Sequence, residues 1–178
     1  MSTDPKRFKT NGNDEGIVTC NNWIGGKDVP SASGEYMDVT SPSNGAVLGK
    51  VALSDANDVA AAVAAAEEAF PLWSSQTAKS RAAVMFRFHA LMEELADELA
   101  DLVVAENGKN KAEALASVAK GNETVEWACS MPQLMQGKVL QVSRGIECKD
   151  ARDPLGVVAC CVPFNFPIMV VSGRFPSP

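Results

Sequence analysis

The chain has 178 residues, enough for one domain with a sizeable core. Its 16 lysines and arginines are outnumbered by 22 aspartates and glutamates, and the net charge of −6 comes without any basic block. This balance makes nucleic acid and anionic membrane surfaces poor partners. No apolar run approaches the length that a bilayer-spanning helix needs.

The cysteines indicate a reducing compartment. There are five of them at irregular spacing, and an odd number of this kind does not suggest a disulfide framework. With a single histidine, the sequence predicts no metal site. Residues 1–18 are polar and are expected to form a disordered lead-in without the apolar core of a secretory signal. We expect a cytoplasmic protein, or a mitochondrial one in a eukaryote.

The N-terminal part favours a small antiparallel cap of three strands. The strands are predicted at residues 19–23, 36–40 and 47–51, where β-branched and aromatic residues recur. Turns rich in glycine, serine and asparagine separate them, at residues 25–27, 31–34 and 41–45.

Two helices are expected next. The first is alanine-rich, with Ser54 as its N-cap and Pro71 as its end. The second covers residues 79–106 and carries an acidic face opposite its apolar stripe. We interpret that face as solvated, and the alternative is a metal site or a catalytic carboxylate pair. His89 is expected to pack or to lie at the surface rather than to act as a base.

Residues 107–108, Asn-Gly, break the helical pattern before a further helix at 111–136, which is interrupted near Pro132 and ended by Gly137. Alternating residues at 138–153 then predict a two-stranded ribbon. Such a ribbon could pair with another subunit.

The most apolar stretch follows the ribbon. Residues 156–162 carry no charge and three valines, and prolines stand on both sides at 154 and 163. This pattern predicts a strand buried on both faces of a parallel sheet. Cys160 and Cys161 would then be inert thiols inside the strand.

Asn165 follows the predicted strand at its C-terminal end, where open α/β sheets bind ligands. Its side-chain amide can donate hydrogen bonds to a group that develops negative charge. The alternative is that Asn165 caps a turn or a following helix. No glycine-rich phosphate loop is present in the sequence.

Taken together, five motifs resemble the aldehyde dehydrogenase superfamily. They lie in the order and spacing of that superfamily, at residues 22–26, 41–45, 69–73, 106–109 and 163–167. Residues 125–130 and 134–137, with Phe164 where most relatives have tryptophan, are similar to the branch of methylmalonate-semialdehyde dehydrogenases, which acylates coenzyme A.

The resemblance implies an α/β fold, of which this chain supplies the N-terminal part: antiparallel cap strands, helices, an oligomerisation ribbon and the first strand of a Rossmann-like cofactor domain. Residues 19–137 would belong to the NAD-binding domain and residues 138–153 to the ribbon. Residues 154–178 would hold the first core strand, after which the chain is expected to be truncated.

The resemblance also implies roles for individual residues. In the family a downstream cysteine attacks the aldehyde, the asparagine matching Asn165 holds the oxyanion, and hydride passes to NAD. The backbone at Val162 and Phe164 would line the nicotinamide side of the NAD site. Lys120 stands where the branch usually has an arginine that binds the substrate carboxylate. A lysine keeps the positive charge but cannot form the two parallel hydrogen bonds of a guanidinium.

None of the five cysteines matches the family's nucleophile, so this chain alone is expected to be inactive. We interpret it as the N-terminal fragment of an NAD-dependent aldehyde dehydrogenase that oxidises methylmalonate or malonate semialdehyde to an acyl-CoA, and that is a homo-oligomer at full length. One alternative is a fragment of a hydrolytic aldehyde dehydrogenase. The other is a non-catalytic interaction module that pairs with full-length subunits.

Overall fold

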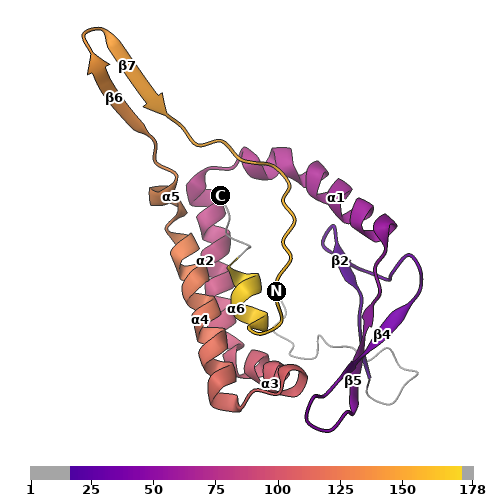
Figure 1. The fold of residues 1–178 in the computed structure, drawn as a ribbon. Helices are drawn as coiled ribbons and strands as arrows, with labels where there is room; N and C mark the ends of the chain where they lie inside the picture. The colour runs from indigo at the N-terminus through magenta and orange to yellow at the C-terminus, as the bar shows by residue number, and fades with distance from the viewer. Residues whose placement is uncertain (1–16, 174–178) are drawn as a thin grey trace. The chain divides into compact units, whose positions relative to one another are not determined.

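The structure is a computed structural model that describes residues 17–173 (Figure 1). The chain divides into two compact units: the first holds residues up to 68 together with 102–109, and the second holds residues 69–101 and those from 110 onward. The predicted lead-in, residues 1–18, lies outside the described residues except for its last two, and Val18 already begins a strand.

The first unit is built on a three-stranded sheet in the order β1–β5–β4. Its strands are β1 (Val18–Cys20), β4 (Tyr36–Thr40) and β5 (Val47–Ala52). β5 pairs antiparallel with β4, as predicted, but parallel with β1. The prediction of a purely antiparallel cap is therefore wrong, because β2, β3 and β4 lie between β1 and β5 and form the long connection that a parallel pair needs.

A hairpin of β2 (Asn22–Ile24) and β3 (Lys27–Val29) follows β1. The predicted strand at 19–23 is thus divided between two sheets. β3, which was not predicted, lies between the predicted turns at 25–27 and 31–34 and shares only Lys27 with the first of them. Gly25 and Gly26 form the two-residue loop with φ values of 59° and 75°. Two-residue hairpin loops of this type need positive φ, which glycine adopts without strain.

Helix α1 (Ala56–Ser74) begins with a reciprocal pair of aspartates. Asp55 Oδ1 accepts from the Asp58 amide at 3.2 Å, and Asp58 Oδ2 accepts from the Asp55 amide at 3.0 Å. Asp55 is therefore the N-cap, and the prediction of Ser54 is wrong because its hydroxyl donates to Asn22 Oδ1 instead. α1 also continues past Pro71 for one more turn, which the Ser75 amide closes by donating to the Pro71 carbonyl.

Asp58 should make the stability of the first unit depend on pH. Its carboxylate is buried and also accepts hydrogen bonds from the Ala32 amide and the Ser31 hydroxyl. The Asp55 amide, followed by those two donors, lowers the pKa of Asp58 against the opposing effect of desolvation. The Asp58 carboxylate therefore stabilises the folded unit at pH values above the unfolded pKa of about 4. This stabilisation is lost as the pH falls toward the lower pKa of the folded state.

We expect Asp58→Asn to destabilise this unit most at neutral pH, and the difference from the wild type to shrink as the pH falls below about 4. Urea unfolding, followed by the NMR amide signals of the β1–β5–β4 sheet, measures both free energies of unfolding across this range. A difference that widens on acidification would contradict the prediction.

The second unit is mostly helical. Besides the end of α1, its helices are α2 (Ala78–Glu94), the first half of α3 (Ala96–Asn107), α4 (Lys111–Cys129), α5 (Met131–Leu134) and α6 (Pro167–Ser172). The predicted helix at 79–106 is broken at Leu95, whose φ and ψ of −98° and 13° leave the helical range, and Asp97 and Glu98 favour a new helix start after it. The predicted interruption of the helix at 111–136 is confirmed at Ser130.

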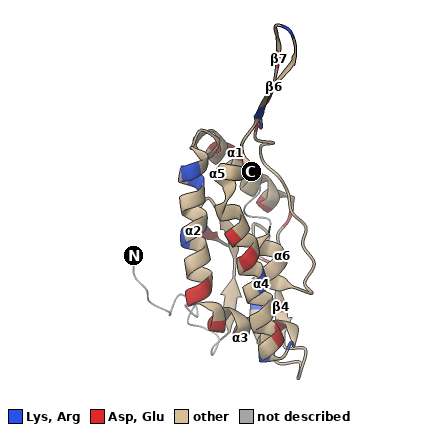
Figure 2. Cartoon of the chain, turned by 90° about the vertical axis from the view of Figure 1, so that its left-hand side faces the viewer, with Lys and Arg blue, Asp and Glu red and all other residues tan. Residues whose placement is uncertain are grey.

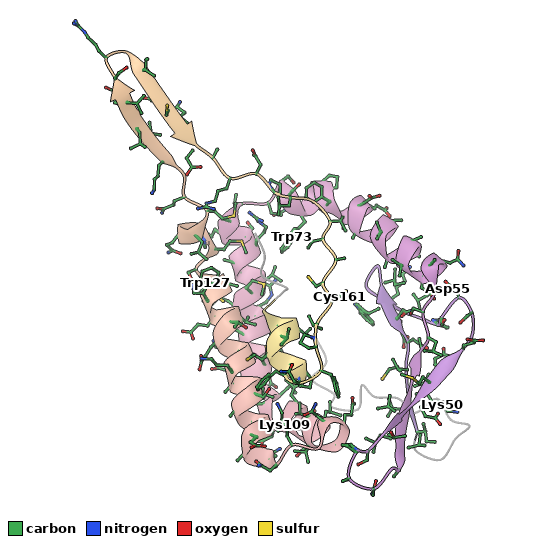
Figure 3. All side chains as sticks on the ribbon, in the orientation of Figure 1. Lys50, Asp55, Trp73, Lys109, Trp127 and Cys161 are labelled. Atoms are coloured by element: carbon green, nitrogen blue, oxygen red, sulfur yellow. The ribbon has the colours of Figure 1, made fainter. Side chains whose placement is uncertain are left out.

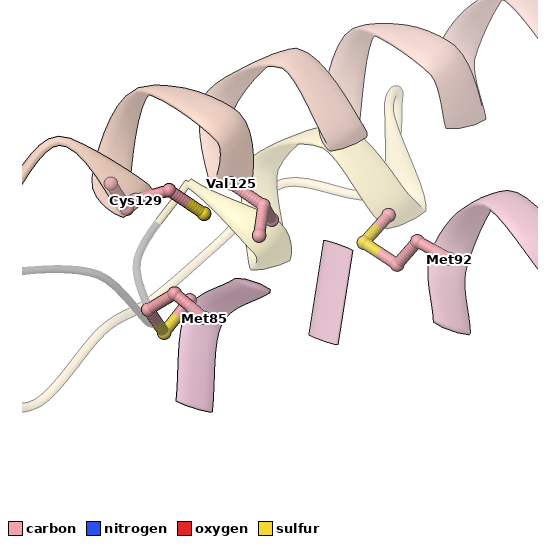
Figure 4. Close-up of a cluster of buried hydrophobic side chains, with 5 residues drawn as sticks. Met85, Met92, Val125 and Cys129 are labelled. Atoms are coloured by element: carbon pink, nitrogen blue, oxygen red, sulfur yellow. The ribbon is translucent and has the colours of Figure 1, made fainter. Parts of the chain in front are cut away.

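The core of this unit lies between α2 and α4, with α6 packed against α4 (Figure 1). Figure 4 shows Met85 and Met92 of α2 facing Val125 and Cys129 of α4. Ala128 completes the buried cluster, and the half-buried Phe88 and Ile168 pack against it. Because Cys129 is buried, and Glu126 lies nearby, the pKa of its thiol is raised.

The predicted solvated acidic face is confirmed. Its members, Glu93, Glu94, Asp97, Glu98 and Asp101, are all exposed, and Figure 2 shows acidic positions in red along α2 and α3. Lys111 Nζ pairs with Asp101 at 2.7 Å and with Asp97 at 3.3 Å. Among the residues that the structure describes, no group of three or more His, Cys, Asp or Glu could hold a metal ion.

The predicted ribbon is confirmed as the antiparallel pair β6 (Lys138–Ser143) and β7 (Ile146–Asp150). Every residue of both strands is exposed, and the ribbon projects away from the helices of its own unit (Figure 1). Within residues 17–173, no helix is long and apolar enough to span a membrane.

The predicted buried strand at 156–162 is wrong. Residues 151–163 form neither helix nor strand, and Val158 is 56% exposed. A strand needs a neighbour that receives its backbone hydrogen bonds, and no segment between residues 17 and 173 pairs with this one. Its apolar side chains are consequently exposed.

Candidate functional site

Asn165 lies in a turn with Phe164 at the end of the extended segment. α6 begins two residues later, and its N-cap is Phe166, whose side chain makes no capping hydrogen bond. Asn165 therefore precedes the N-cap position, so the alternative that it caps the following helix is wrong. The residue is exposed.

The position of this turn depends on the packing of α6. Gly121 of α4 has no side chain, and a Cβ there would lie 3.2 Å from Met169 Cα and 3.3 Å from Ile168 Cγ2. At the far end of α6, the Ser172 hydroxyl donates to Met92 Sδ at 3.8 Å. The two contacts hold α6 against α4 and α2, and thereby hold the turn that carries Asn165.

Lys120 directly precedes Gly121 on α4. Its Nζ forms an ion pair with Glu123 Oε2 one helical turn later, and its side chain is 61% exposed. Lys120 thus lies on α4, and the Asn165 turn lies directly before α6. These two helices pack against each other. An anionic ligand at Lys120 would compete with Glu123 for the ammonium group.

Val162 and Phe164 lie on the same extended stretch as Asn165, and both are exposed. Residues 154–166 carry no charged side chain. The contact of this backbone with the nicotinamide side of NAD, which the resemblance assigns to Val162 and Phe164, stays a prediction.

The prediction that Cys160 and Cys161 are buried is wrong, because both thiols are exposed together with the rest of the extended segment. Cys20 and Cys148 are also exposed, and Cys129 is buried in the helical core.

His89 is packed, as predicted, because its side chain is only 22% exposed and lies between polar neighbours. Its Nδ1 lies 3.5 Å from Asn122 Nδ2 and 3.7 Å from Glu93 Oε2.

Sequence reasoning missed the role of Gly121. A single glycine inside a long helical pattern lowers helix stability and usually has a packing reason, and that signal was available. The partner of Gly121 could not be read from the pattern, because α6 follows 46 residues later.

Gly121→Leu should destabilise the second unit by about 1–3 kcal/mol, because the new side chain enters the contact between α4 and α6. Chemical unfolding followed by helical circular dichroism measures the change. Ala119→Leu, at an exposed position of the same helix, is the matched control and should stay within about 0.5 kcal/mol of the wild type. Equal effects of both variants would contradict this role for Gly121.

Comparison with known proteins decides the family. The model of the Aldehyde dehydrogenase family matches residues 29–177. The chain belongs to the aldehyde dehydrogenase family. This member of the family is 46% identical over 159 residues to "Malonate-semialdehyde dehydrogenase 2" of Geobacillus thermodenitrificans, a match that covers 89% of this chain and 33% of the relative.

Two solved structures are similar to this aldehyde dehydrogenase chain. A methylmalonate-semialdehyde dehydrogenase from Oceanimonas doudoroffii superposes with a TM-score of 0.85 at 37% identity, over 90% of this chain and 33% of that one. A Sinorhizobium meliloti protein assigned to the same activity and complexed with NAD superposes with a TM-score of 0.84 at 32% identity, over 89% of this chain and 33% of that one. The chain thus spans about a third of the length of the relatives that it matches.

Proposed function

We propose that this chain forms the N-terminal part of an NAD-dependent aldehyde dehydrogenase that oxidises malonate or methylmalonate semialdehyde. The observation that carries the proposal is the 46% identity to a malonate-semialdehyde dehydrogenase over 89% of the chain. The family match at 29–177 includes both Lys120 and Asn165.

Asn165 is assigned to the oxyanion. When a thiolate attacks the aldehyde carbon, the carbonyl oxygen gains negative charge, and a positioned amide N–H stabilises it more than it stabilises the neutral carbonyl. The position of Asn165 in an exposed turn ahead of α6 supports this role, because α6 is held against α4 and fixes where the turn lies. The nucleophile is proposed to be none of the five cysteines of this chain, which on its own is therefore inactive.

Lys120 is assigned to the substrate carboxylate. Malonate and methylmalonate semialdehydes carry one carboxylate, and an ammonium group attracts it as a point charge without the two parallel hydrogen bonds of a guanidinium. The exposure of the Lys120 side chain supports this assignment, because a ligand can approach the ammonium from solvent and replace Glu123.

NAD, when bound, supplies the acceptor for the hydride that leaves the substrate carbon. The exposed, uncharged backbone at Val162 and Phe164 is proposed to line the nicotinamide side. Coenzyme A is proposed as the acyl acceptor, and the similarity of residues 125–130 and 134–137 to the coenzyme A-acylating branch supports it.

A second candidate, a module that joins subunits, is favoured by one observation. The β6–β7 ribbon exposes four large apolar residues, Val139, Leu140, Val142 and Ile146, together with the backbone edges of its two strands. Exposed strand edges and apolar side chains are features that pair with another chain. We propose that the full-length protein is a homo-oligomer that uses this ribbon.

The test is a chimera in which residues 19–167 of this chain replace the matching segment of the Geobacillus thermodenitrificans relative. We expect NADH formation from malonate semialdehyde and NAD, with the acyl-CoA product detected by mass spectrometry. NADH formation that is unaffected by coenzyme A, with free acid as product, would favour the hydrolytic alternative. A folded chimera that oxidises other aldehydes but not malonate semialdehyde would overturn the substrate assignment.

The isolated chain, assayed in parallel, should form no NADH. Its co-purification with the complete relative would favour the subunit-joining module. Turnover by the isolated chain would overturn the proposal that its own cysteines do not supply the nucleophile.

A further inference from the structure

Glu123 is the ionic partner of Lys120. The two residues lie three positions apart on α4, a spacing that places helical side chains next to each other. Lys120 Nζ donates a hydrogen bond to Glu123 Oε2, and the two groups form an ion pair. Figure 3 shows the side chains of this helix and labels Trp127 on it. The proposed function assigns no role to Glu123.

The elements around this pair contribute no other partner for the ammonium group. Within residues 17–173, Glu123 is the only carboxylate that forms an ion pair with Lys120. Residues 154–166, which lead into α6, and α6 itself carry no charged side chain. Glu123 is therefore the group that decides how freely a ligand carboxylate can bind the ammonium.

We infer that Glu123 is a positioning residue of the substrate site: it holds the Lys120 ammonium and thereby sets its affinity for the substrate carboxylate. The inference rests on the proposed function, in which Lys120 binds the carboxylate of malonate or methylmalonate semialdehyde. A free ammonium attracts this carboxylate with a full positive charge, whereas the ion pair has no net charge. The substrate must therefore displace Glu123 in order to bind.

The size of the effect follows from the strength of the ion pair. Both side chains are largely exposed, at 61% for Lys120 and 59% for Glu123. At such exposure an ion pair favours the paired over the unpaired state by about 1.4- to 5-fold. The ammonium is then free in only part of the molecules, and its apparent affinity for a ligand carboxylate is lowered by about two- to sixfold. An uncharged aldehyde does not use the ammonium, so Glu123 reduces the preference for semialdehydes over uncharged aldehydes.

The test uses the chimera that carries residues 19–167 of this chain in the Geobacillus thermodenitrificans relative. Glu123→Gln removes the charge and keeps the length of the side chain. We expect its KM for malonate semialdehyde to be about two- to sixfold lower than that of the unsubstituted chimera, with kcat unchanged, because the substitution relieves only the competition in binding. The KM for propanal, an uncharged aldehyde with the same number of carbon atoms, should not change.

Two further variants show whether the charge at position 123 itself is responsible. Glu123→Asp keeps a carboxylate and should return the KM for malonate semialdehyde toward the unsubstituted value. Glu113→Gln is the matched control, because it removes an exposed carboxylate of the same helix about two turns before Lys120, and it should leave both KM values unchanged. A fall in KM for Glu113→Gln as large as that for Glu123→Gln would indicate an effect of overall charge and would overturn the role of Glu123.

Lys120→Met distinguishes a failure of this inference from a failure of the Lys120 assignment. If the assignment holds, Lys120→Met raises the KM for malonate semialdehyde, and the addition of Glu123→Gln to it has no further effect. If Lys120→Met leaves that KM unchanged, the assignment of Lys120 and the inference both fail. If Lys120→Met raises the KM but Glu123→Gln alone leaves it unchanged or raises it, the assignment stands and the role of Glu123 is overturned.

Discussion

Asn165→Ala in the chimera with the Geobacillus thermodenitrificans relative should lower kcat by about 100- to 1,000-fold, because removal of one preorganised oxyanion donor typically costs that much. The substitution removes the side-chain amide and leaves the turn backbone and α6 in place. Steady-state NADH formation from malonate semialdehyde measures the loss. KM should change much less, because the donor acts mainly on charge that develops in the transition state.

Gln76→Ala is the control for this variant, since Gln76 is an exposed amide in the loop between α1 and α2. It should leave kcat unchanged. If Asn165→Ala retains most of the wild-type kcat while it raises KM, the residue contributes to substrate binding and not to the oxyanion.

Met92→Ala should destabilise the second unit by about 2–5 kcal/mol, the range for deletion of a buried methionine side chain. Met92 is only 4% exposed, lies in the cluster between α2 and α4, and accepts the hydrogen bond from Ser172 of α6. The variant thus loses core packing and one contact of α6 together. Urea unfolding followed by helical circular dichroism gives the change in the free energy of unfolding.

Met37→Ala tests whether the effect comes from burial. Met37 is 54% exposed on β4, so the same chemical change should cost no more than about 0.5 kcal/mol. A cost for Met92→Ala as small as that for Met37→Ala would contradict the core that the structure assigns to α2 and α4. In the chimera, we further expect Met92→Ala to lower NADH formation, because α6 holds the Asn165 turn.

Several local features could be predicted from the sequence because they depend on neighbouring residues alone. The ribbon at 138–153 follows from alternation around Arg144-Gly145, and Gly145 takes the positive φ of 79° that its turn needs. The interruption near Pro132 and the solvated acidic face follow in the same way from local chemistry. The Gly25-Gly26 hairpin was equally local, and the two-residue glycine loop is the signal that would have found it.

Other features depend on partners that are distant in the sequence. The parallel pairing of β1 with β5 brings Val18 opposite Gly49, and a Cβ at Gly49 would lie 2.7 Å from the Val18 carbonyl oxygen. No periodicity within either strand reveals that approach. In the same way, the choice of Asp55 over Ser54 as N-cap depends on Asn22, which takes the Ser54 hydroxyl from 32 residues away.

The sequence by itself determined the family resemblance, which rests on motif order, and the type of most of the elements, which rests on periodicity along the chain. The candidate roles of Asn165, Lys120, Val162 and Phe164 are implied by that resemblance and stay predictions. Only the tertiary structure decided that residues 156–162 are exposed, since an apolar run becomes a buried strand only when a neighbouring strand receives its hydrogen bonds. It also decided that Gly121 holds α6 in place, because that contact joins two helices whose approach no local pattern encodes.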